Sequence, residues 1–262
     1  MKKLMFAATV AAAMAGFAVE SQIVGYGTNN NKGNNAPTWG NSFVSMTATT
    51  KANFRLGDLV LKGCTWGVDW IGFIDPTTSI IDPTKNVSYY SAEQAISEGG
   101  SAEDAKWEDN SEACMDDVEY PFGTGFLCNF VSPNVTITYS GEVNTDPLLA
   151  VIDCTGKSAP FVVNPYPGDL TFGQIKMTNC TWGVDWVGFV DAASSAVDPT
   201  RNISYYSAEQ AIEEGGSAED AEWEDNSEAC KDDVPLKMGE GFLGNFVSTG
   251  IKIYFPVYTP AK

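Results

Sequence analysis

A long internal repeat constrains the fold of this chain more than any other feature of its sequence. The segment from Cys64 to Val118 aligns without a gap with the segment from Cys180 to Val234, and 43 of the 55 aligned positions are identical. A weaker match continues at 123–132 and 239–248, where GTGFLCNFVS faces GEGFLGNFVS. The offset of 116 residues is too long for a solenoid unit and has the size of a domain. The repeat therefore predicts two tandem copies of one domain.

The residue pattern within each copy favours β-strands. Alternating segments such as CTWGVDWIGF from Cys64 are typical of strands, and short apolar runs separated by Gly and Pro are typical of an all-β fold. We therefore expect a mainly β protein built from two tandem homologous β-sandwich or barrel-like domains.

Each copy also contains a short segment with helical signals. Ser91 and Gln94 have the spacing of a capping box, and Gly99 and Gly100 are typical of a helix end. The segment from Ser101 has the signals of a second short helix, and the same pieces recur in the second copy. The sequence therefore predicts a short helical acidic insert in each domain.

Three similar strand-like segments mark the domain boundaries. SQIVGYGT opens the first copy at 21–28, VTITYSGEV follows at 135–143, and IKIYFPVYT follows at 251–259. We place a signal peptide at 1–18, the first β-domain at 19–135 and the second at 136–262. The simpler interpretation of the last segment is a strand that closes the last sheet. The alternative is pairing with the edge of a neighbouring molecule.

The first residues are typical of a bacterial export signal. Lys2 and Lys3 precede an apolar Ala-rich run, and small residues at Gly16 and Ala18 suit cleavage after Ala18. A membrane anchor is the alternative, but the run is short for a span of about 20 residues. No later stretch is apolar enough to cross a bilayer. We therefore expect a secreted protein or one of the bacterial cell envelope, with no transmembrane segment after cleavage.

Composition excludes several classes of function. The 262 residues include 34 acidic and 15 basic side chains, which give a formal net charge of −19, and no histidine. The charge argues against a nucleic-acid binder, because phosphate backbones attract an excess of Lys and Arg. The absence of histidine excludes a Ser-His-Asp triad, a Cys-His pair and any metal site with histidine ligands.

The six cysteines suggest three disulfide bonds in an exported protein. Two pairs have the same spacing of 50 positions, one in each copy, and the remaining two cysteines have no counterpart in the repeat. Metal binding is the weaker alternative, because no close C-x-x-C pair exists. The predicted pairs are Cys64 with Cys114, Cys180 with Cys230, and Cys128 with Cys154.

Acidic residues cluster after the predicted helix in both copies. A solvated acidic face is the simpler interpretation. Calcium is the alternative cofactor, because it takes six to eight oxygen ligands from loops rich in carboxylates. The candidate calcium ligands are Asp109, Asn110, Asp116, Asp117, Asp225, Asn226, Asp232 and Asp233.

Seven tryptophans raise the possibility of carbohydrate binding, since exposed aromatic rings stack on sugars. Four of them lie on alternating segments and favour core packing, namely Trp66, Trp70, Trp182 and Trp186. Three others lie in polar segments and are the candidates for exposed ligand contacts, namely Trp39, Trp107 and Trp223.

A short motif connects the chain to a wider group. Gly123, Gly125 and Phe126 form a G-x-G-F motif between a Trp-bearing strand and a closing strand, and Gly239, Gly241 and Phe242 repeat it. In this order of pieces the chain resembles secreted β-rich repeat domains of uncharacterised bacterial envelope proteins. The resemblance implies a location outside the cell and no particular activity. The helical acidic insert and the paired cysteines depart from that pattern.

These observations favour a structural or interaction protein over an enzyme. A glycosidase would need two carboxyl groups across a cleft, one with a raised pKa, whereas the acids here cluster in polar runs. We therefore expect an adhesion, surface-layer or filament-type subunit that binds itself or a surface glycan or protein. The alternative is a carbohydrate-binding module that uses exposed tryptophans.

Overall fold

The computed structural model describes residues 24–31, 53–78, 85–121, 123–132, 135–142, 150–166, 168–189, 201–237 and 240–257. We call 24–142 the first half and 150–257 the second half. The predicted signal peptide at 1–18 and the candidate Trp39 lie outside the described residues. The described chain is mainly β with antiparallel sheets, which confirms the coarse fold prediction. None of these sheets closes into a barrel within the described ranges.

The first half contains β1 (Val24–Asn31), β2 (Asn53–Arg55), η1 (Leu56–Asp58), β3 (Leu59–Lys62), β4 (Trp70–Phe73), β5 (Val87–Tyr90), α2 (Ala92–Ser97), η3 (Ala102–Asp104), β6 (Lys106–Asp109), β7 (Glu119–Pro121), β8 (Phe126–Asn129) and β9 (Val135–Glu142). The second half contains β10 (Val151–Asp153), β11 (Phe161–Val163), β12 (Leu170–Thr171), η4 (Phe172–Gln174), β13 (Lys176–Thr178), β14 (Trp186–Phe189), β15 (Ile203–Tyr206), α3 (Ala208–Glu213), η5 (Ala218–Asp220), β16 (Glu222–Asp225), β17 (Pro235–Leu236), β18 (Gly241–Asn245) and β19 (Lys252–Tyr254).

Strand pairing follows the same plan in both halves. The order β1-β9-β3 corresponds to β10-β19-β13, and β6-β5-β4-β8 corresponds to β16-β15-β14-β18, with β11 added beside β18. Strand β9 pairs with both β1 and β3, so it belongs to a sheet of the first half. A boundary based on strand pairing therefore falls after Glu142, whereas the sequence analysis placed it before Thr136. Strand β19 pairs with β10 and β13, as expected of a strand that closes the last sheet.

Buried side chains form one large cluster in each half. The cluster of the first half draws Leu59 and Ile137 from the β1-β9-β3 sheet, and Ile71 and Phe126 from the β6-β5-β4-β8 sheet. Because the core lies between side chains of two sheets, the arrangement fits a β-sandwich. The cluster of the second half spans residues from Ala150 to Phe255.

Strand β11 connects the two halves. One edge of β11 pairs with β18, and Val162 forms a bridge with Thr124 on the other side. The amide of Val163 donates to the carbonyl of Gly123 over 3.1 Å. A Cβ at Gly125 would collide with the Phe161 ring, and one at Gly241 would collide with the Val162 carbonyl. Both G-x-G-F motifs therefore contain a glycine where β11 passes closely.

The predicted strand across Cys64–Phe73 is wrong in its first part. Residues 66–68 form a turn, and β4 begins only at Trp70. The buried Asp69 carboxylate holds this turn, because it accepts hydrogen bonds from the amides of Thr65, Val131 and Ser132 over 2.7 to 2.9 Å. Trp66 therefore lies in the turn before the strand that was predicted to bury it.

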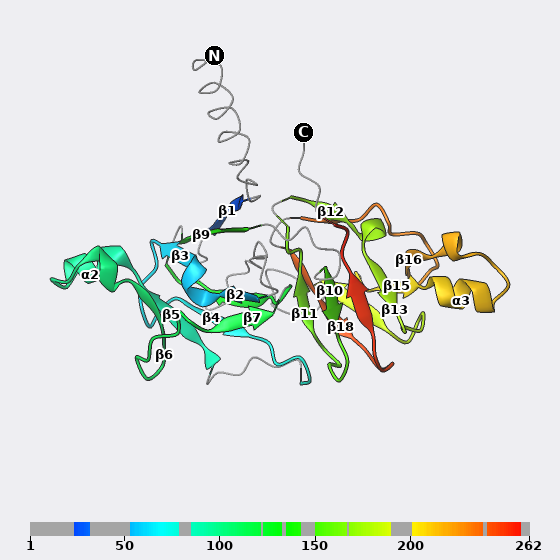
Figure 1. The fold of residues 1–262 in the computed structure, drawn as a ribbon, viewed down its shortest axis with the longest axis horizontal. Coiled ribbons are helices and arrows are strands. Elements are labelled where there is room, and N and C mark those ends of the chain that lie inside the picture. The colour runs from blue at the N-terminus through cyan, green and yellow to red at the C-terminus, as the bar shows by residue number, and fades with distance from the viewer. Residues whose placement is uncertain are drawn as a thin grey trace, which may run out of the picture.

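The predicted helix is confirmed in both halves. The Ser91 hydroxyl accepts a hydrogen bond from the Gln94 amide at the start of α2, and Ser207 does the same for α3. Gly99 follows α2 with a φ of 91°, a conformation that favours glycine. Along the longest axis of the molecule, α2 and α3 lie at opposite ends (Figure 1).

The first two disulfide predictions are wrong, because Cys64, Cys114, Cys180 and Cys230 are all free thiols. The Cys64 thiol contacts the carbonyl of Tyr89 on β5, while Cys114 forms a bridge with Glu108 on β6. Since β6 pairs with β5, it lies between the two cysteines. Equal sequence spacing therefore did not bring the sulfur atoms together.

The third disulfide prediction is also wrong. Cys128 and Cys154 are free and buried. Cys128 packs in the core of the first half and Cys154 in the core of the second. Burial raises the pKa of the Cys128 thiol well above its usual value and that of Cys154 to about 12. Both residues therefore act as small apolar core side chains.

Within the described ranges, no helix combines the length and the apolar character that a membrane span requires.

Candidate binding pocket

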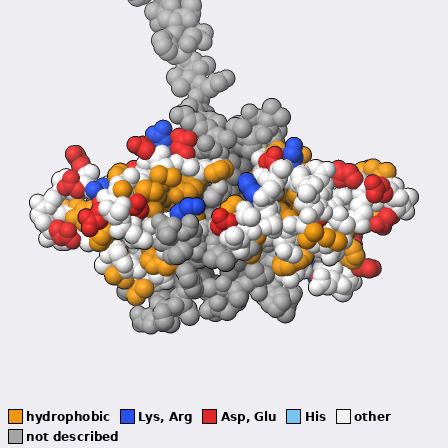
Figure 2. Space-filling view, turned by 90° about the horizontal axis from the view of Figure 1, so that it is seen from below, with side chains coloured by type: hydrophobic (Ala, Val, Ile, Leu, Met, Phe, Trp, Pro, Cys, Tyr) orange, Lys and Arg blue, Asp and Glu red, His pale blue; other side chains and the backbone are white. Residues whose placement is uncertain are grey.

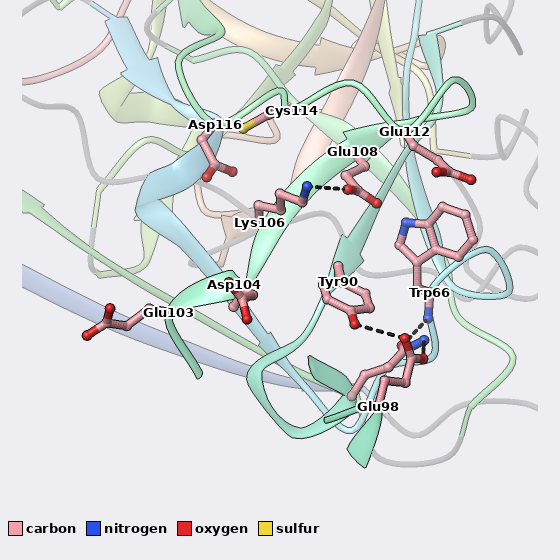
Figure 3. Close-up of a pocket in the computed structure, with 12 residues that line it drawn as sticks. Trp66, Tyr90, Glu98, Glu103, Asp104, Lys106, Glu108, Glu112, Cys114 and Asp116 are labelled. Carbon is pink, nitrogen blue, oxygen red and sulfur yellow. Dashed lines mark hydrogen bonds and ion pairs between the residues drawn. The ribbon is translucent and has the colours of Figure 1, made fainter. Parts of the chain in front are cut away.

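A surface pocket of about 770 Å³ lies at the end of the first half, between α2, β5 and the β6 hairpin (Figure 3). We call it the first pocket. Its lining residues are Trp66, Tyr90, Gln94, Glu98, Glu103, Asp104, Ala105, Lys106, Glu108, Glu112, Cys114 and Asp116. Two aromatic rings and six carboxylates therefore surround one lysine.

The antiparallel pairing of β5 and β6 positions the centre of the first pocket. Lys106 lies directly opposite Tyr90 in the register, and Glu108 lies opposite Ser88. Because side chains alternate along a strand, Lys106 and Glu108 share one face of β6 and Trp107 points the other way. This alternation places charges in the pocket and an indole in the core.

Hydrogen bonds of α2 and the residue after it form one side of the first pocket. The Gln94 side chain accepts from the Trp66 amide over 3.1 Å and donates to Glu98 over 3.0 Å. The Tyr90 hydroxyl donates to the other oxygen of Glu98 over 2.9 Å. These two donors lower the pKa of Glu98, and the same contact raises the pKa of Tyr90. Glu98 is therefore held in its ionised form beside both rings.

Lys106 carries the positive charge of the first pocket. Its ammonium lies 2.8 Å from Glu108 Oε1, and this contact raises the pKa of Lys106. The indole N–H of Trp66 is buried and has no hydrogen-bond partner. Figure 3 shows Glu108 and Glu112 beside that indole. The pocket thus presents an ion pair, free carboxylates and an unsatisfied donor next to aromatic surface.

The predicted calcium ligands do not come together. The Asp109 carboxylate accepts hydrogen bonds within its own hairpin turn, from Ser111 and Ala113, and these bonds lower its pKa. Asp116 accepts from the Trp107 amide over 2.7 Å, and the Asp117 side chain is 99% exposed. Asn110 is exposed on the same hairpin turn.

The corresponding carboxylates of the second half behave in the same way. Asp225 accepts from Ser227 and Ala229, and Asp232 accepts from the Trp223 amide over 2.9 Å. Asn226 and Asp233 are exposed. Among the described residues, no three Cys, Asp or Glu side chains are grouped as metal ligands. The calcium prediction is therefore not supported, because four of the carboxylates accept hydrogen bonds from turn and strand amides and the other four candidates are exposed.

The tryptophan assignments are reversed. Trp107 and Trp223, predicted to be exposed, are 0% exposed, and their indole N–H groups donate to the carbonyls of Leu59 and Ile175 over 2.9 and 2.8 Å. All four tryptophans predicted to pack in the core are only partly buried, namely Trp66, Trp70, Trp182 and Trp186. The sequence signal for the turn that contains Trp66 was Gly67 close to Asp69, because Gly and Asp are frequent in turns.

The second half repeats the lining of the first pocket with one exception. Eleven of the twelve residues have identical counterparts at the offset of 116, and the exception is Glu222 in place of Lys106. We call the counterpart residues the second-half site. Figure 2 shows Asp and Glu side chains gathered at both ends of the molecule.

Replacement of lysine by glutamate changes the electrostatics of the second-half site. Partial burial raises the pKa of Glu224, and the nearby carboxylates of Glu222 and Glu228 raise it further. Hydrogen bonding to Glu222 raises the pKa of the exposed Cys230 thiol. Acidic groups therefore crowd one another at the position where the first pocket has an ion pair.

Searches of family models, curated proteins and solved structures gave no match to this chain.

Proposed function

We propose that the protein is a secreted or cell-surface interaction protein without catalytic activity, of the adhesion, surface-layer or filament-subunit type. In this proposal a signal peptide at 1–18 is removed and two homologous β-sandwich domains remain. The observation that carries the proposal is the recurrence of the pocket-lining residues in both halves, with α2 and α3 at opposite ends (Figure 1). A chain with similar surfaces at both ends can bridge two partners.

Exposed apolar residues beside both turns support end-to-end contact. Val68 and Val131 are 44% and 43% exposed, and Val184 and Val247 are 44% and 69% exposed. Asp69 ties Val131 to the Val68 turn, and Asp185 ties Val247 to the matching turn. Apolar side chains that recur on the surface are typical of interaction sites. We therefore place the self-association contacts at these two ends.

Light scattering of the mature protein over a range of concentrations tests this proposal. We expect the wild type to form species larger than a dimer, at an ionic strength that screens its negative charge. The single variant Val247→Glu blocks one end and should stop growth at small species. Val60→Glu is a matched control, because Val60 is 39% exposed and belongs to β3 and to neither turn. A wild type that stays monomeric at every concentration would contradict self-assembly.

Carbohydrate binding is the second candidate function. The observation in its favour is that Trp66 and Tyr90 line a pocket together with carboxylates that can accept hydrogen bonds from sugar hydroxyls. This version uses Trp66 and Trp182 in place of the buried Trp107 and Trp223. A glycan array compared with the Trp66→Ala and Trp182→Ala variants tests it, and unchanged binding in both variants would contradict it.

A further inference from the structure

We propose that the second-half site binds an external primary ammonium group between Glu222 and Glu224, where the first pocket holds the ammonium of its own Lys106. The ligand is a free alkyl amine or the lysine side chain of a partner. This inference rests on the proposed function only in treating the two ends as binding surfaces.

The first pocket shows how this scaffold holds an ammonium. Lys106 Nζ lies 2.8 Å from Glu108 Oε1, and the Glu108 side chain is only 9% exposed. Lys106 lies opposite Tyr90 in the register of β5 and β6, and both side chains line the pocket. A charge-assisted contact of this length to a shielded carboxylate is a strong ammonium contact. In the first pocket, the ammonium position beside Glu108 is therefore occupied by the protein's own Lys106.

The second-half site keeps the acceptors and loses the ammonium. Glu222 lies opposite Tyr206, and Glu224 lies opposite Ser204, as Lys106 and Glu108 do relative to β5. Glu222 and Glu224 share one face of β16 because they are two residues apart. Lys231, which has Met115 as its counterpart, lies 2.8 Å from Asp225 Oδ2 and is engaged there. An ammonium placed between Glu222 and Glu224 would relieve the repulsion between these carboxylates.

The surrounding groups favour an organic cation. The Tyr206 hydroxyl is held by Glu214 over 2.9 Å, and Gln210 connects Glu214 to the Trp182 backbone, as in the first pocket. The buried indole N–H of Trp182 lies beside the Glu224 carboxylate and acts to lower the pKa of that group. Aromatic rings beside carboxylates attract ammonium and its alkyl chain through cation–π and apolar contact. Among the described residues, no cluster of metal ligands competes for this role.

A reciprocal charge swap in the full chain tests the inference. Isothermal titration calorimetry measures binding of cadaverine and, separately, of an acetylated and amidated Gly-Lys-Gly peptide. The peptide with norleucine in place of lysine lacks the ammonium and is the ligand control. Ionic strength is held constant, because the net charge of −19 attracts any cation.

The variants use side chains that the repeat itself contains. Glu222→Lys copies Lys106 into the second half, and Lys106→Glu does the reverse. Glu213→Lys makes the same charge change on the exposed end of α3, and its counterpart Ser97 does not line the first pocket. Because Lys106 and Glu222 occupy the same strand position, opposite Tyr90 and Tyr206, we expect the swap to retain the fold.

We expect one ammonium site in the wild type and two in Lys106→Glu. Glu213→Lys should bind within about twofold of the wild type, whereas Glu222→Lys should bind at least tenfold more weakly. Binding of cadaverine alone identifies a free amine, and binding of both probes identifies a lysine side chain as an acceptable source.

Several results would overturn the inference. One is equal loss in Glu213→Lys and Glu222→Lys, which would mean attraction by net charge alone. Others are unchanged binding in Glu222→Lys, equal binding of the norleucine peptide, or no ammonium binding by the wild type. If ammonium binding fails while end-dependent assembly is observed, the proposed function stands and only this ligand assignment falls.

Discussion

The two ends of the molecule share one scaffold and differ in charge at its centre. In the first pocket Lys106 neutralises Glu108, whereas in the second-half site Glu222 adds a carboxylate beside Glu224. The buried hydrogen bonds beside both sites are nearly the same. The indole N–H groups of Trp107 and Trp223 donate to the equivalent carbonyls of Leu59 and Ile175 over 2.9 and 2.8 Å. The comparison teaches that buried contacts keep the scaffold constant while one outward-facing strand position changes the charge of the site.

The largest expected effect comes from removing the buried tryptophans. Trp107→Ala and Trp223→Ala should each lower the free energy of unfolding of their half by about 3–5 kcal/mol, because each leaves a large cavity and an unpaired carbonyl. Urea unfolding measures this, and Trp66→Ala should cost clearly less because Trp66 is only partly buried. The Trp→Phe variants keep most of the ring volume if the alanine variants do not fold. A strongly unequal loss between the halves would break the comparison.

The next effect concerns the buried aspartates that hold the turns. Asp69→Ala and Asp185→Ala should each cost about 3 kcal/mol, because three backbone amides lose a charged acceptor. Asp→Asn keeps one acceptor oxygen and should cost less. Chemical unfolding combined with circular dichroism measures both. An Asp69→Ala variant as stable as the wild type would refute this role.

A smaller effect distinguishes the two ends directly. Glu222→Lys should raise stability at neutral pH by up to about 1 kcal/mol, because it replaces a repelling carboxylate with an ion pair to Glu224. The raised pKa of Glu224 means that its ionised form opposes folding, and protonation relieves this as pH falls. The gain should therefore shrink as pH falls through the usual glutamate pKa of 4.5. Thermal unfolding at pH 7 and pH 4 measures it, and a gain that grows on acidification would contradict the assignment.

A still smaller effect concerns the pKa of the aspartate in each hairpin turn, Asp109 in the first half and Asp225 in the second. Lys231 and Ser227 lower the pKa of Asp225, while Asp109 has Met115 in place of that lysine. A lowered carboxyl pKa contributes stability that is fully present above the usual value of 3.8 and is lost as pH falls below it. Lys231→Met should therefore raise the pKa of Asp225, measured by carboxyl NMR titration, and Met115→Lys should lower that of Asp109. No movement in either variant would exclude the ion pair in solution.

The smallest expected effect separates free thiols from disulfides. Cys114→Ser and Cys230→Ser should leave the unfolding free energy nearly unchanged, because both thiols are free and exposed. A disulfide that closes a loop of this length would instead contribute about 3–4 kcal/mol. Alkylation of both thiols in the folded protein provides the matching chemical measurement. A large loss of stability would restore the disulfides predicted from sequence.

Much of the architecture was predictable because its signals are local. The Ser91 cap and the Gly99 stop lie within one short segment, and a helix that short depends mainly on its ends. The prediction of a mainly β chain likewise followed from alternating apolar residues. The Cys64–Phe73 segment misled because alternation cannot reveal that Asp69 folds back on Thr65.

The candidate site was only partly predictable. The acidic residues around Glu108 were recognised as a group, with a solvated face as the simpler interpretation and calcium as the alternative. The tryptophans chosen for ligand contact, Trp107 and Trp223, are buried. Alternation along β6 shows that Trp107 and Glu108 face opposite ways, yet it does not tell which face is covered. Which face of β6 is buried depends on the β1-β9-β3 sheet. Leu59 of that sheet accepts the Trp107 hydrogen bond and lies far from Trp107 in the sequence.

By itself the sequence determined that the chain carries a repeat, that it is mainly β, and that each copy has a capped helix followed by acidic residues. Only the tertiary structure decided which indoles are buried, which cysteines lie apart, and that α2, β5 and β6 enclose a pocket. The physical reason is that propensity and capping act over a few residues, whereas burial, sulfur separation and pocket shape depend on which strands pair across the fold.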